Sequence, residues 1–325
     1  MSNYSVGTYL KKCLMIGALM TLGASPVWSA PKGSPWGKDY FPNIELINQD
    51  GKKVRFYDDL IKDKIVVINF IFTHCADSCP AETASLRQVY TLLGDRVGKD
   101  IFFYSISIDP DQDSPQMLKE YAERFNISTD AGWSFLTGSK ADVSLLRATL
   151  GLNRDAAETA NLGEHSTTIM IGNESTGQWV KRSPFDEPKV LAWMIGRTIS
   201  GFNAYQNAQK TPSVSYAKAQ KIPKISKGAE LFHNRCVSCH SLGKEDGLGP
   251  GLQGVTQKRN PAWLARWIQN PDKLLAEKDP LAMELYERYK KIEMPNLKLS
   301  DTEVEALIGH MALSDKSVKK QPVFE

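Results

Sequence analysis

Residues 65–80 read IVVINFIFTHCADSCP, and this stretch decides the fold of the larger part of the chain. Its first eight residues are mostly apolar and β-branched, which predicts a strand buried on both faces. Cys75 and Cys79 follow the end of that strand, where α/β domains place reactive groups. Pro80 suits the first helical position and puts Cys79 at the helix cap, where helix-end amides are expected to favour a thiolate.

The alternation of strands and helices continues outward from this stretch. We expect helices over 80–93, 114–125, 139–150 and 187–199, a second buried strand over 101–108, and a hairpin of 167–171 with 178–181. Ser114 and Ser139 are placed to cap two of the helices. This order of elements is typical of an α/β thioredoxin-like domain.

The C-terminal part has a different character, with short helices between Gly- and Pro-rich loops. Residues 236–240 read CVSCH, the attachment sequence of haem c. Two thiols one helical turn apart can each add to a haem vinyl group, and the imidazole of His240 then meets the iron. A zinc half-site or a redox pair is the alternative. After this motif the chain offers no other Cys and only His310, so a zinc site lacks ligands.

The sixth iron ligand is expected to come from a loop ahead of the last helix. Met294 precedes Pro295 there, and its thioether would complete the coordination and raise the potential. Met283 competes, but its surroundings predict a helix in which it packs as core or surface. The last helix opens with a capping box at Ser300–Glu303 and is expected to end near 312.

Residues 226–314 resemble a class I cytochrome c. The matching features are Lys227-Gly228 to Phe232, the C-x-x-C-H motif, Gly249-Pro250-Gly251-Leu252, Trp263 to Trp267, and Met294-Pro295. The resemblance implies an all-α domain with haem c bound covalently at Cys236 and Cys239, axial ligands His240 and Met294, and Pro250 packed on the proximal ligand. It also implies crossed first and last helices. His310 stands where the family commonly has an aromatic residue, and we expect it to loosen that crossing.

The N-terminal cysteine pair has the spacing C-x-x-x-C, one residue longer than in thioredoxins. The longer loop suits two sulfurs that converge on one ion, and two soft thiolates select Cu(I) or Zn. A nitrogen ligand would let the site hold Cu(II) as well. His165 is the candidate, because it immediately precedes the strand predicted at 167–171. His74 is weaker, since a residue next to Cys75 on an extended chain points the opposite way.

Residues 35–200 resemble the Sco/SenC family of copper chaperones for cytochrome c oxidase assembly. The resemblance rests on the motif at 73–80, on SIDPDQDSP at 107–115, and on His165-Ser166. It implies that Cys75, Cys79 and His165 bind copper. Asp77 then supports the loop, and Glu164, where the family often has Asp, orients His165. The segment from Asp109 to Asp113 is interpreted as a structural turn and not as a calcium loop.

The first 29 residues resemble a secretion signal. Lys11 and Lys12 precede an apolar stretch over 13–24, and 27–29 (VWS) is a suitable cleavage site. An uncleaved anchor is the alternative. Either interpretation exports the remainder of the chain, so we expect a periplasmic protein whose cysteines work in an oxidising compartment.

The predicted organisation has five segments. They are a signal peptide or anchor at 1–29, a Sco/SenC thioredoxin-like domain at 35–202, a basic linker at 203–226, a cytochrome c domain at 227–314, and a tail at 315–325. The composition, 42% hydrophobic and 24% charged, excludes wholesale disorder. A net charge of +3 gives no case for nucleic-acid binding.

The sequence therefore predicts a copper metallochaperone with a fused haem c for one-electron transfer to the copper or the dithiol. Expected partners are the apo copper-site subunit of cytochrome c oxidase or another cuproenzyme, and an electron-transfer protein, near a membrane. Two alternatives stay open. One is a haem-linked thiol–disulfide oxidoreductase in which Cys75 and Cys79 are catalytic and His165 is dispensable. The other is a redox sensor.

Overall fold

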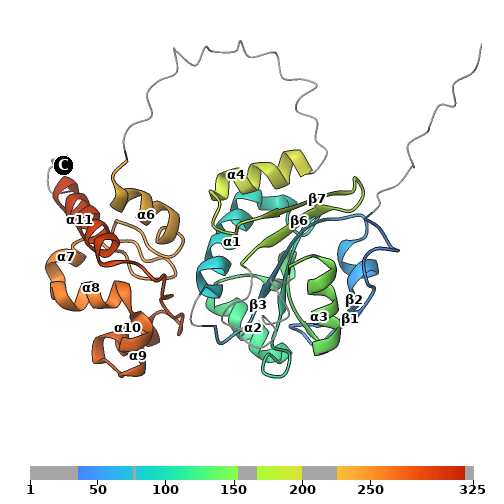
Figure 1. The fold of residues 1–325 in the computed structure, drawn as a ribbon, viewed down its shortest axis with the longest axis horizontal. Coiled ribbons are helices and arrows are strands. Elements are labelled where there is room, and N and C mark those ends of the chain that lie inside the picture. Colours follow the sequence, from blue (N-terminus) through green and yellow to red (C-terminus); the bar gives the residue numbers. More distant parts are fainter. Residues whose placement is uncertain (1–35, 76–77, 153–166, 200–224, 319–325) are drawn as a thin grey trace, which may run out of the picture. The chain divides into compact units, whose positions relative to one another are not determined.

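The computed structural model describes residues 36–75, 78–152, 167–199 and 225–318. Within 36–199 a seven-stranded sheet has the order β2-β1-β5-β4-β3-β6-β7 (Figure 1). Strands β5, β4 and β3 run parallel, and the remaining pairs are antiparallel. The strands are β1 Glu45–Asn48, β2 Lys53–Arg55, β3 Ile65–Ile71, β4 Ile101–Ser107, β5 Trp133–Gly138, β6 Ile169–Asn173 and β7 Gln178–Arg182.

Strand β3 lies inside the sheet, and all seven of its residues are buried. It pairs in parallel with β4, with Ile65 opposite Ile101, and antiparallel with β6, with Ile65 opposite Asn173. The prediction of a strand covered on both faces is confirmed. The sheet therefore holds the start of the cysteine loop at a fixed depth in the domain.

Helices cover both faces of the sheet. The helices α1 (Cys79–Leu93), α2 (Pro115–Arg124) and α4 (Pro188–Trp193) lie on one face, and α3 (Lys140–Thr149) lies on the other (Figure 1). The side chains of Ser114 and Ser139 accept the amides of Met117 and Asp142, so both predicted caps are confirmed. The thioredoxin-like fold class expected for this part is observed.

Several elements differ from the sequence predictions. Strands β1, β2 and β5 were not predicted, because β1 and β2 are very short and β5 (WSFLTG) mixes apolar with small polar residues. The helix α1 begins at Cys79 with Ser78 as its N-cap, one residue earlier than expected. After α4 the chain widens into a π-helical segment, Met194–Ile199, in place of one continuous α-helix.

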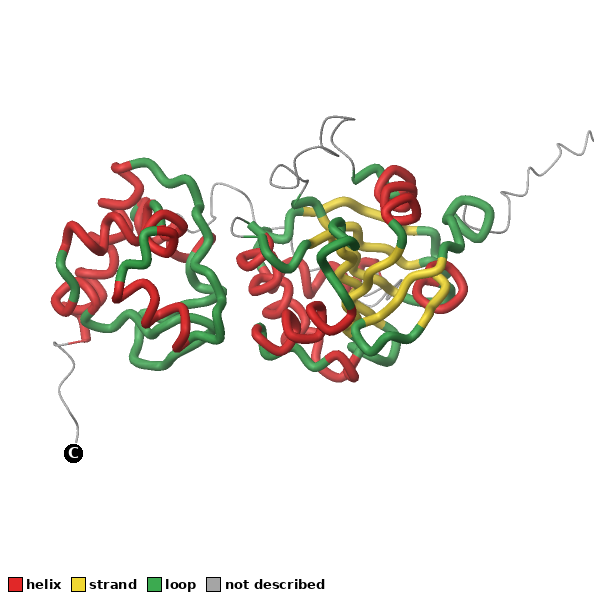
Figure 2. Tube along the Cα trace, turned by 90° about the horizontal axis from the view of Figure 1, so that it is seen from below, coloured by secondary structure: helices red, strands yellow, loops and turns green. Residues whose placement is uncertain are grey.

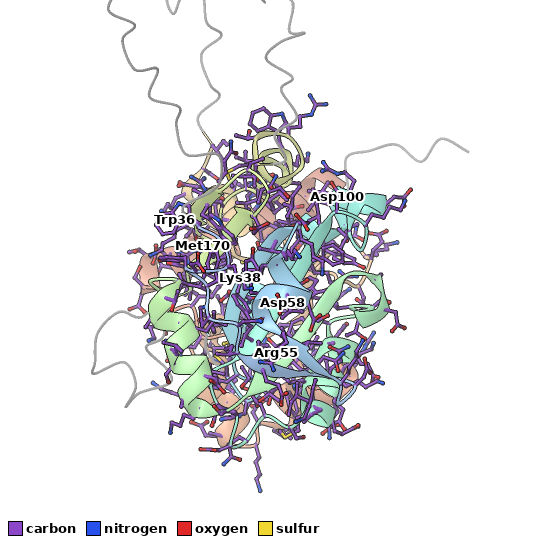
Figure 3. The ribbon with its side chains drawn as sticks, turned by 90° about the vertical axis from the view of Figure 1, so that its right-hand side faces the viewer. Trp36, Lys38, Arg55, Asp58, Asp100 and Met170 are labelled. Atoms are coloured by element: carbon purple, nitrogen blue, oxygen red, sulfur yellow. The ribbon has the colours of Figure 1, made fainter. Side chains whose placement is uncertain are left out.

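The segment after β2 closes the outer edge of this part. The π-helical segment η1 (Phe56–Ile61) follows Arg55 directly, and Figure 3 shows Arg55 and Asp58 on that side. The side-chain amide of Asn43 donates to Asp58 at 2.6 Å, and the backbone carbonyl of Asn43 accepts from the guanidinium of Arg55 at 3.3 Å. In the strand order β2 is separated from β3 by β1, β5 and β4, so this edge lies away from the cysteines.

The described residues 225–318 form helices and loops with no strand (Figure 2). The helices are α6 Lys227–Arg235, α7 Val255–Lys258, α8 Pro261–Gln269, α9 Pro271–Ala276, α10 Pro280–Arg288 and α11 Asp301–Val318. The predicted capping box forms, since the amide of Ser300 donates to the Glu303 carboxylate at 3.1 Å. The fold class expected for this part, all-α, is observed.

Helix α11 runs further than the predicted end near residue 312. Asp315 is buried and accepts hydrogen bonds from the amide of Gly254 at 2.6 Å and from the hydroxyl of Thr256 at 2.9 Å. The added turn is thereby tied to the loop that begins α7. The predicted tail, 315–325, thus begins as helix.

Helices α6 and α11 cross at small residues. A Cβ added to Gly228 would lie 2.0 Å from the carbonyl oxygen of Ala306. His310 lies in this crossing, where its ring packs against Phe232 with centroids 5.8 Å apart. The crossing closes an apolar core formed by Leu231, Phe232, Leu264, Ile268, Leu299, Val304, Leu307 and Met311.

No helix in the part of the chain that the structure describes is both long and apolar enough to cross a membrane. The predicted signal segment, 1–29, lies outside the described residues, as does most of the predicted linker.

Replacing Gly228 by Val should destabilise the helical part by about 1–3 kcal/mol, because the helices must separate to admit the side chain. Gly309→Ala on α11 is the matched control, since a Cβ there meets nothing within 4 Å. Thermal unfolding followed at the C-terminal tryptophans measures both variants. Equal stability of Gly228→Val and the wild type would contradict the close crossing.

Candidate metal centres

The two N-terminal cysteines meet where β3 leads into α1. The amide of Cys75 donates to the carbonyl of Phe72 at 3.4 Å, and Cys79 is the first residue of α1. Neither cysteine forms a disulfide, their exposed fractions are 6% and 0%, and a side-chain hydrogen bond joins them. Residues 76–77 between them lie outside the described residues. The pair predicted from sequence is brought together in a buried position.

Burial controls the acidity of this pair. Desolvation, followed by the hydrogen bond and negative charge of Cys75, raises the pKa of the Cys79 thiol well above its usual value. The expectation that helix-end amides would favour a thiolate at Cys79 is therefore wrong for the metal-free protein. A cation that replaces the thiol protons reverses the balance, because it neutralises the charge that burial disfavours.

A buried carboxylate anchors the base of the cysteine loop. Asp113 is fully buried and accepts from the amide and hydroxyl of Thr73, the latter at 2.6 Å. It also accepts from the hydroxyl of Ser107 at 2.6 Å. Because Thr73 follows β3 and Ser107 ends β4, Asp113 ties the ends of two parallel strands together. This is the structural role expected for the turn at 109–113.

His74 is turned toward that same turn. Its Nε2 lies 3.3 Å from Asp109 Oδ2, its Nδ1 lies 3.8 Å from Asp113 Oδ1, and about half of the side chain is exposed. Its ring also contacts Phe72 edge-on, with centroids 5.1 Å apart. These partners give His74 a place beside the acidic turn, in keeping with its low rank as a copper ligand.

Two buried polar groups beside the pair were not found from sequence. The hydroxyl of Tyr121 donates to the carbonyl of Cys79 at 3.3 Å and lies 2.9 Å from the hydroxyl of Thr83. Glu82 is 1% exposed and accepts from Asn69 at 3.0 Å. The position of Glu82 one helical turn after Cys79 was the available signal, but a Glu in a helix is ordinarily taken for a surface residue.

The predicted third ligand, His165, lies outside the described residues, and so do Asp77 and Glu164. Among the described residues no group of three or more His, Cys, Asp or Glu side chains is placed to hold a metal. The assignment of His165 thus stays a prediction.

The C-terminal motif presents a histidine in the form that a metal requires. His240 Nδ1 lies 2.9 Å from the carbonyl of Pro250, so this nitrogen carries the proton and Nε2 keeps its lone pair. Burial lowers the pKa of His240, which favours the neutral ring. A Cβ on Gly249 would lie 2.5 Å from His240 Cε1, so only glycine lets this loop pack on the ring.

A pocket opens beside His240, and Cys236, Cys239 and Met294 line it. Its apolar wall includes Leu252, Val255, Leu264, Trp267, Ile268 and Leu297. Met283, the competing thioether, lies in α10 and is not among the lining residues. Met311 of α11 also lines the pocket and was missed from sequence, where its helical spacing marks it as core. Paired thiols, a neutral imidazole, a thioether and apolar walls fit haem c.

Comparisons with known proteins match both parts of the chain. Residues 35–195 match the SCO1/SenC family model, and residues 225–313 match the cytochrome c family model. The chain is a SCO1/SenC domain joined to a cytochrome c domain. The fusion expected from the two resemblances is confirmed.

Curated relatives match the SCO1/SenC domain. The SCO1 protein homolog of Bacillus subtilis (strain 168) is 37% identical over 91 residues, which are 28% of this chain and 45% of that protein. The mitochondrial SCO1 homolog 1 of Arabidopsis thaliana is 35% identical over 100 residues, 31% of this chain and 28% of that protein. The chain spans about half or less of the length of these relatives.

Solved structures are similar to the same domain. A SCO1/SenC family lipoprotein from Bacillus anthracis str. Ames is 23% identical, with a TM-score of 0.41, over 53% of this chain and 99% of that one. Copper-bound ScoI of Arabidopsis thaliana is 24% identical, with a TM-score of 0.37, over 46% of this chain and 91% of that one.

Asp113→Asn should lower the free energy of unfolding of the SCO1/SenC domain by about 1–3 kcal/mol, because an amide nitrogen cannot accept the hydrogen bonds that a carboxylate oxygen accepts. Asp111→Asn, an exposed position in the same turn, is the control and should change stability by less than about 0.5 kcal/mol. Urea unfolding of the full chain followed by far-UV circular dichroism measures both. Identical midpoints would show that Asp113 does not anchor the loop.

Proposed function

We propose that this protein is a copper metallochaperone of the Sco type that delivers copper to the binuclear copper site of a cytochrome c oxidase or a similar cuproenzyme. The observation that carries the proposal is the buried, hydrogen-bonded thiol pair Cys75–Cys79 at the end of β3 in a SCO1/SenC domain. Copper is the cargo, and the apo copper-site subunit is the partner.

The ligand set follows from the chemistry of the donors. Two thiolates from Cys75 and Cys79 favour Cu(I), and the imidazole of His165 extends the site to Cu(II). Because burial holds the pKa of the Cys79 thiol well above its usual value, copper loading releases a proton from this thiol, and transfer of the copper to an acceptor returns it. Handover proceeds by ligand exchange, in which sulfurs of the acceptor replace these sulfurs one at a time.

The cytochrome c domain gives the protein a one-electron centre. In this proposal Cys236 and Cys239 would attach haem c, His240 and Met294 would hold its iron, and Pro250 would pack on the ring of His240. When bound, the haem supplies single-electron transfer. Copper also changes by one electron, whereas a dithiol changes by two, so copper is the better-matched internal partner. Export to the periplasm, near a membrane-bound oxidase, completes the proposal.

A thiol–disulfide oxidoreductase is the second candidate. The hydrogen bond between Cys75 and Cys79 favours it, because thiols this close can form a disulfide after modest movement. This function needs the two sulfurs alone, so removal of the predicted nitrogen ligand separates it from copper handling.

His165→Ala should weaken Cu(II) binding strongly, because it removes a direct ligand. Loss of a residue that only supports a ligand costs roughly 10- to 100-fold in metal affinity, and we expect a larger loss here. Anaerobic titration of the reduced full chain with a competing chelator measures the affinity. His74→Ala is the matched control and should bind copper as the wild type does. Unchanged affinity in His165→Ala, with disulfide reductase activity retained, would favour the oxidoreductase.

Copper bound by the thiol pair should change the oxidation state of the haem. When Cu(II) is added anaerobically to protein with ferrous haem, we expect ferric haem and Cu(I) to appear in equal amounts, since one electron passes between them. The haem absorption spectrum and the copper electron paramagnetic resonance signal follow the two centres. In Cys75→Ser/Cys79→Ser the exchange should become bimolecular and depend on free copper. Ferrous haem beside bound Cu(II) would argue against communication between the centres.

A further inference from the structure

The carboxylate of Asp246 joins two parts of the cytochrome c domain that border the pocket beside His240. Its Oδ1 accepts from the backbone amide of Gly251 at 2.9 Å, and its Oδ2 accepts from the hydroxyl of Tyr289 at 2.9 Å. The guanidinium of Arg288 lies 3.5 Å from the same Oδ2. Asp246 belongs to the loop after the C-x-x-C-H motif, whereas Arg288 ends α10 and Tyr289 follows it. The carboxylate therefore ties the loop on the histidine side of the pocket to the end of α10.

The peptide group between Pro250 and Gly251 connects this carboxylate to His240. Its N–H donates to Asp246, and its C=O lies 2.9 Å from His240 Nδ1 and accepts the proton of that nitrogen. A trans peptide group points its N–H and its C=O in opposite directions, so one planar unit lies between the carboxylate and the imidazole. Asp246 and His240 are therefore linked by two consecutive hydrogen bonds through a conjugated group.

Neighbouring contacts hold this peptide group in place. Just before it, the amide of Gly249 donates to the carbonyl of Cys239 at 2.9 Å. A Cβ added to Gly251 would lie 2.6 Å from the backbone carbonyl carbon of Lys244, so the loop leaves no room for a side chain there. We therefore expect neutralisation of Asp246 to change the strength of the hydrogen bonds and not the course of the loop.

Asp246 can act on His240 by two routes. Hydrogen bonds from Gly251 and then from Tyr289 lower the pKa of Asp246, so the carboxyl is ionised at neutral pH. The side chain is 44% exposed, and salt screens the field that its charge exerts through space. The route through the peptide group is less affected, because hydrogen bonds in a chain polarise and strengthen one another. A carboxylate on the amide side thus makes the carbonyl of Pro250 a stronger acceptor for His240.

We propose that Asp246 is a positioning residue for His240: acting through the peptide group between Pro250 and Gly251, its negative charge strengthens the hydrogen bond at Nδ1 and makes Nε2 a better electron donor to iron. A carboxylate that bonds a metal-binding histidine directly has the same effect, and here one peptide group is inserted. A more strongly donating imidazole favours ferric haem, so Asp246 lowers the reduction potential of the haem. The inference rests on the haem c site of the proposed function and is independent of copper handling.

The test uses the full chain with haem attached and without copper, in which the haem is titrated against mediators of known potential. Asp246→Asn removes the charge and keeps an oxygen that can accept from Gly251. Tyr289→Phe keeps the charge and removes one of its donors. Glu245→Gln is the matched control, because it removes the same charge from the next residue, which is also exposed and joins the loop through its backbone carbonyl.

At a fixed ambient potential, we expect the ratio of ferrous to ferric haem to be about 2- to 5-fold higher in Asp246→Asn than in the wild type, which is a rise of roughly 20 to 40 mV at 59 mV per tenfold. Tyr289→Phe should lower this ratio, because the carboxylate then shares its charge with one donor fewer. Glu245→Gln should change the ratio by less than about 1.5-fold, since water and salt screen an exposed charge. Equal ratios in Asp246→Asn and Glu245→Gln, or shifts of the same sign in Asp246→Asn and Tyr289→Phe, would overturn the proposal.

Nuclear magnetic resonance of the ferrous protein gives a second readout. The resonance of the His240 Nδ1 proton should move upfield in Asp246→Asn, because its hydrogen bond weakens, and an unchanged resonance would contradict the proposal. A wild type without covalent haem at Cys236 and Cys239 would refute the haem site of the proposed function and this inference with it. Intact haem with an unchanged potential in Asp246→Asn would refute the inference alone, so the two failures are distinguishable.

Discussion

The desolvation of two sulfurs at the end of β3 is the constraint on which the N-terminal site depends. Burial of the whole of β3 fixes the depth of the loop, and Asp113 fastens its base to β4. At that depth an isolated thiolate is unfavourable, and the raised pKa of Cys79 follows. A buried thiol pair therefore favours a bound soft cation, because the cation neutralises the charge of the thiolates. A solvent-exposed redox pair has no such need, because water stabilises its thiolate.

Much of this fold could be predicted from sequence, and the reasons are local. A run of apolar β-branched residues can hardly be anything but a buried strand, and serines ahead of Pro115 and Lys140 cap helices through their own side chains. The strand β5 was not predicted, because it is held by its pairing with β4 and β1, and the local sequence WSFLTG gives no sign of that pairing. The start of α1 was misplaced by one residue, since Ser78 and Cys79 compete for the cap.

The two candidate sites also differ in how much of each could be predicted from local sequence. Residues 236–240 carry their chemistry in five consecutive positions, and the partner of His240 follows ten residues later at Pro250. The predicted third copper ligand, His165, lies ninety positions after Cys75, and its place before the strand expected at 167–171 and the family resemblance both pointed to it. Glu82 and Tyr121 were not predicted as part of the site, because a sequence does not show that a side chain is buried or which of its oxygens form hydrogen bonds.

At both candidate metal centres the metal-binding side chains are buried, where charge is unfavourable, but the two centres differ in the charge of these side chains. The haem pocket prepares a ligand that is already neutral, because burial and the carbonyl of Pro250 hold His240 as an uncharged imidazole with a free lone pair. The thiol pair must instead create charge in a buried place, and must lose it again when the metal leaves. If the protein delivers copper as proposed, the metal has to pass to an acceptor, so ease of release matters more than tight binding.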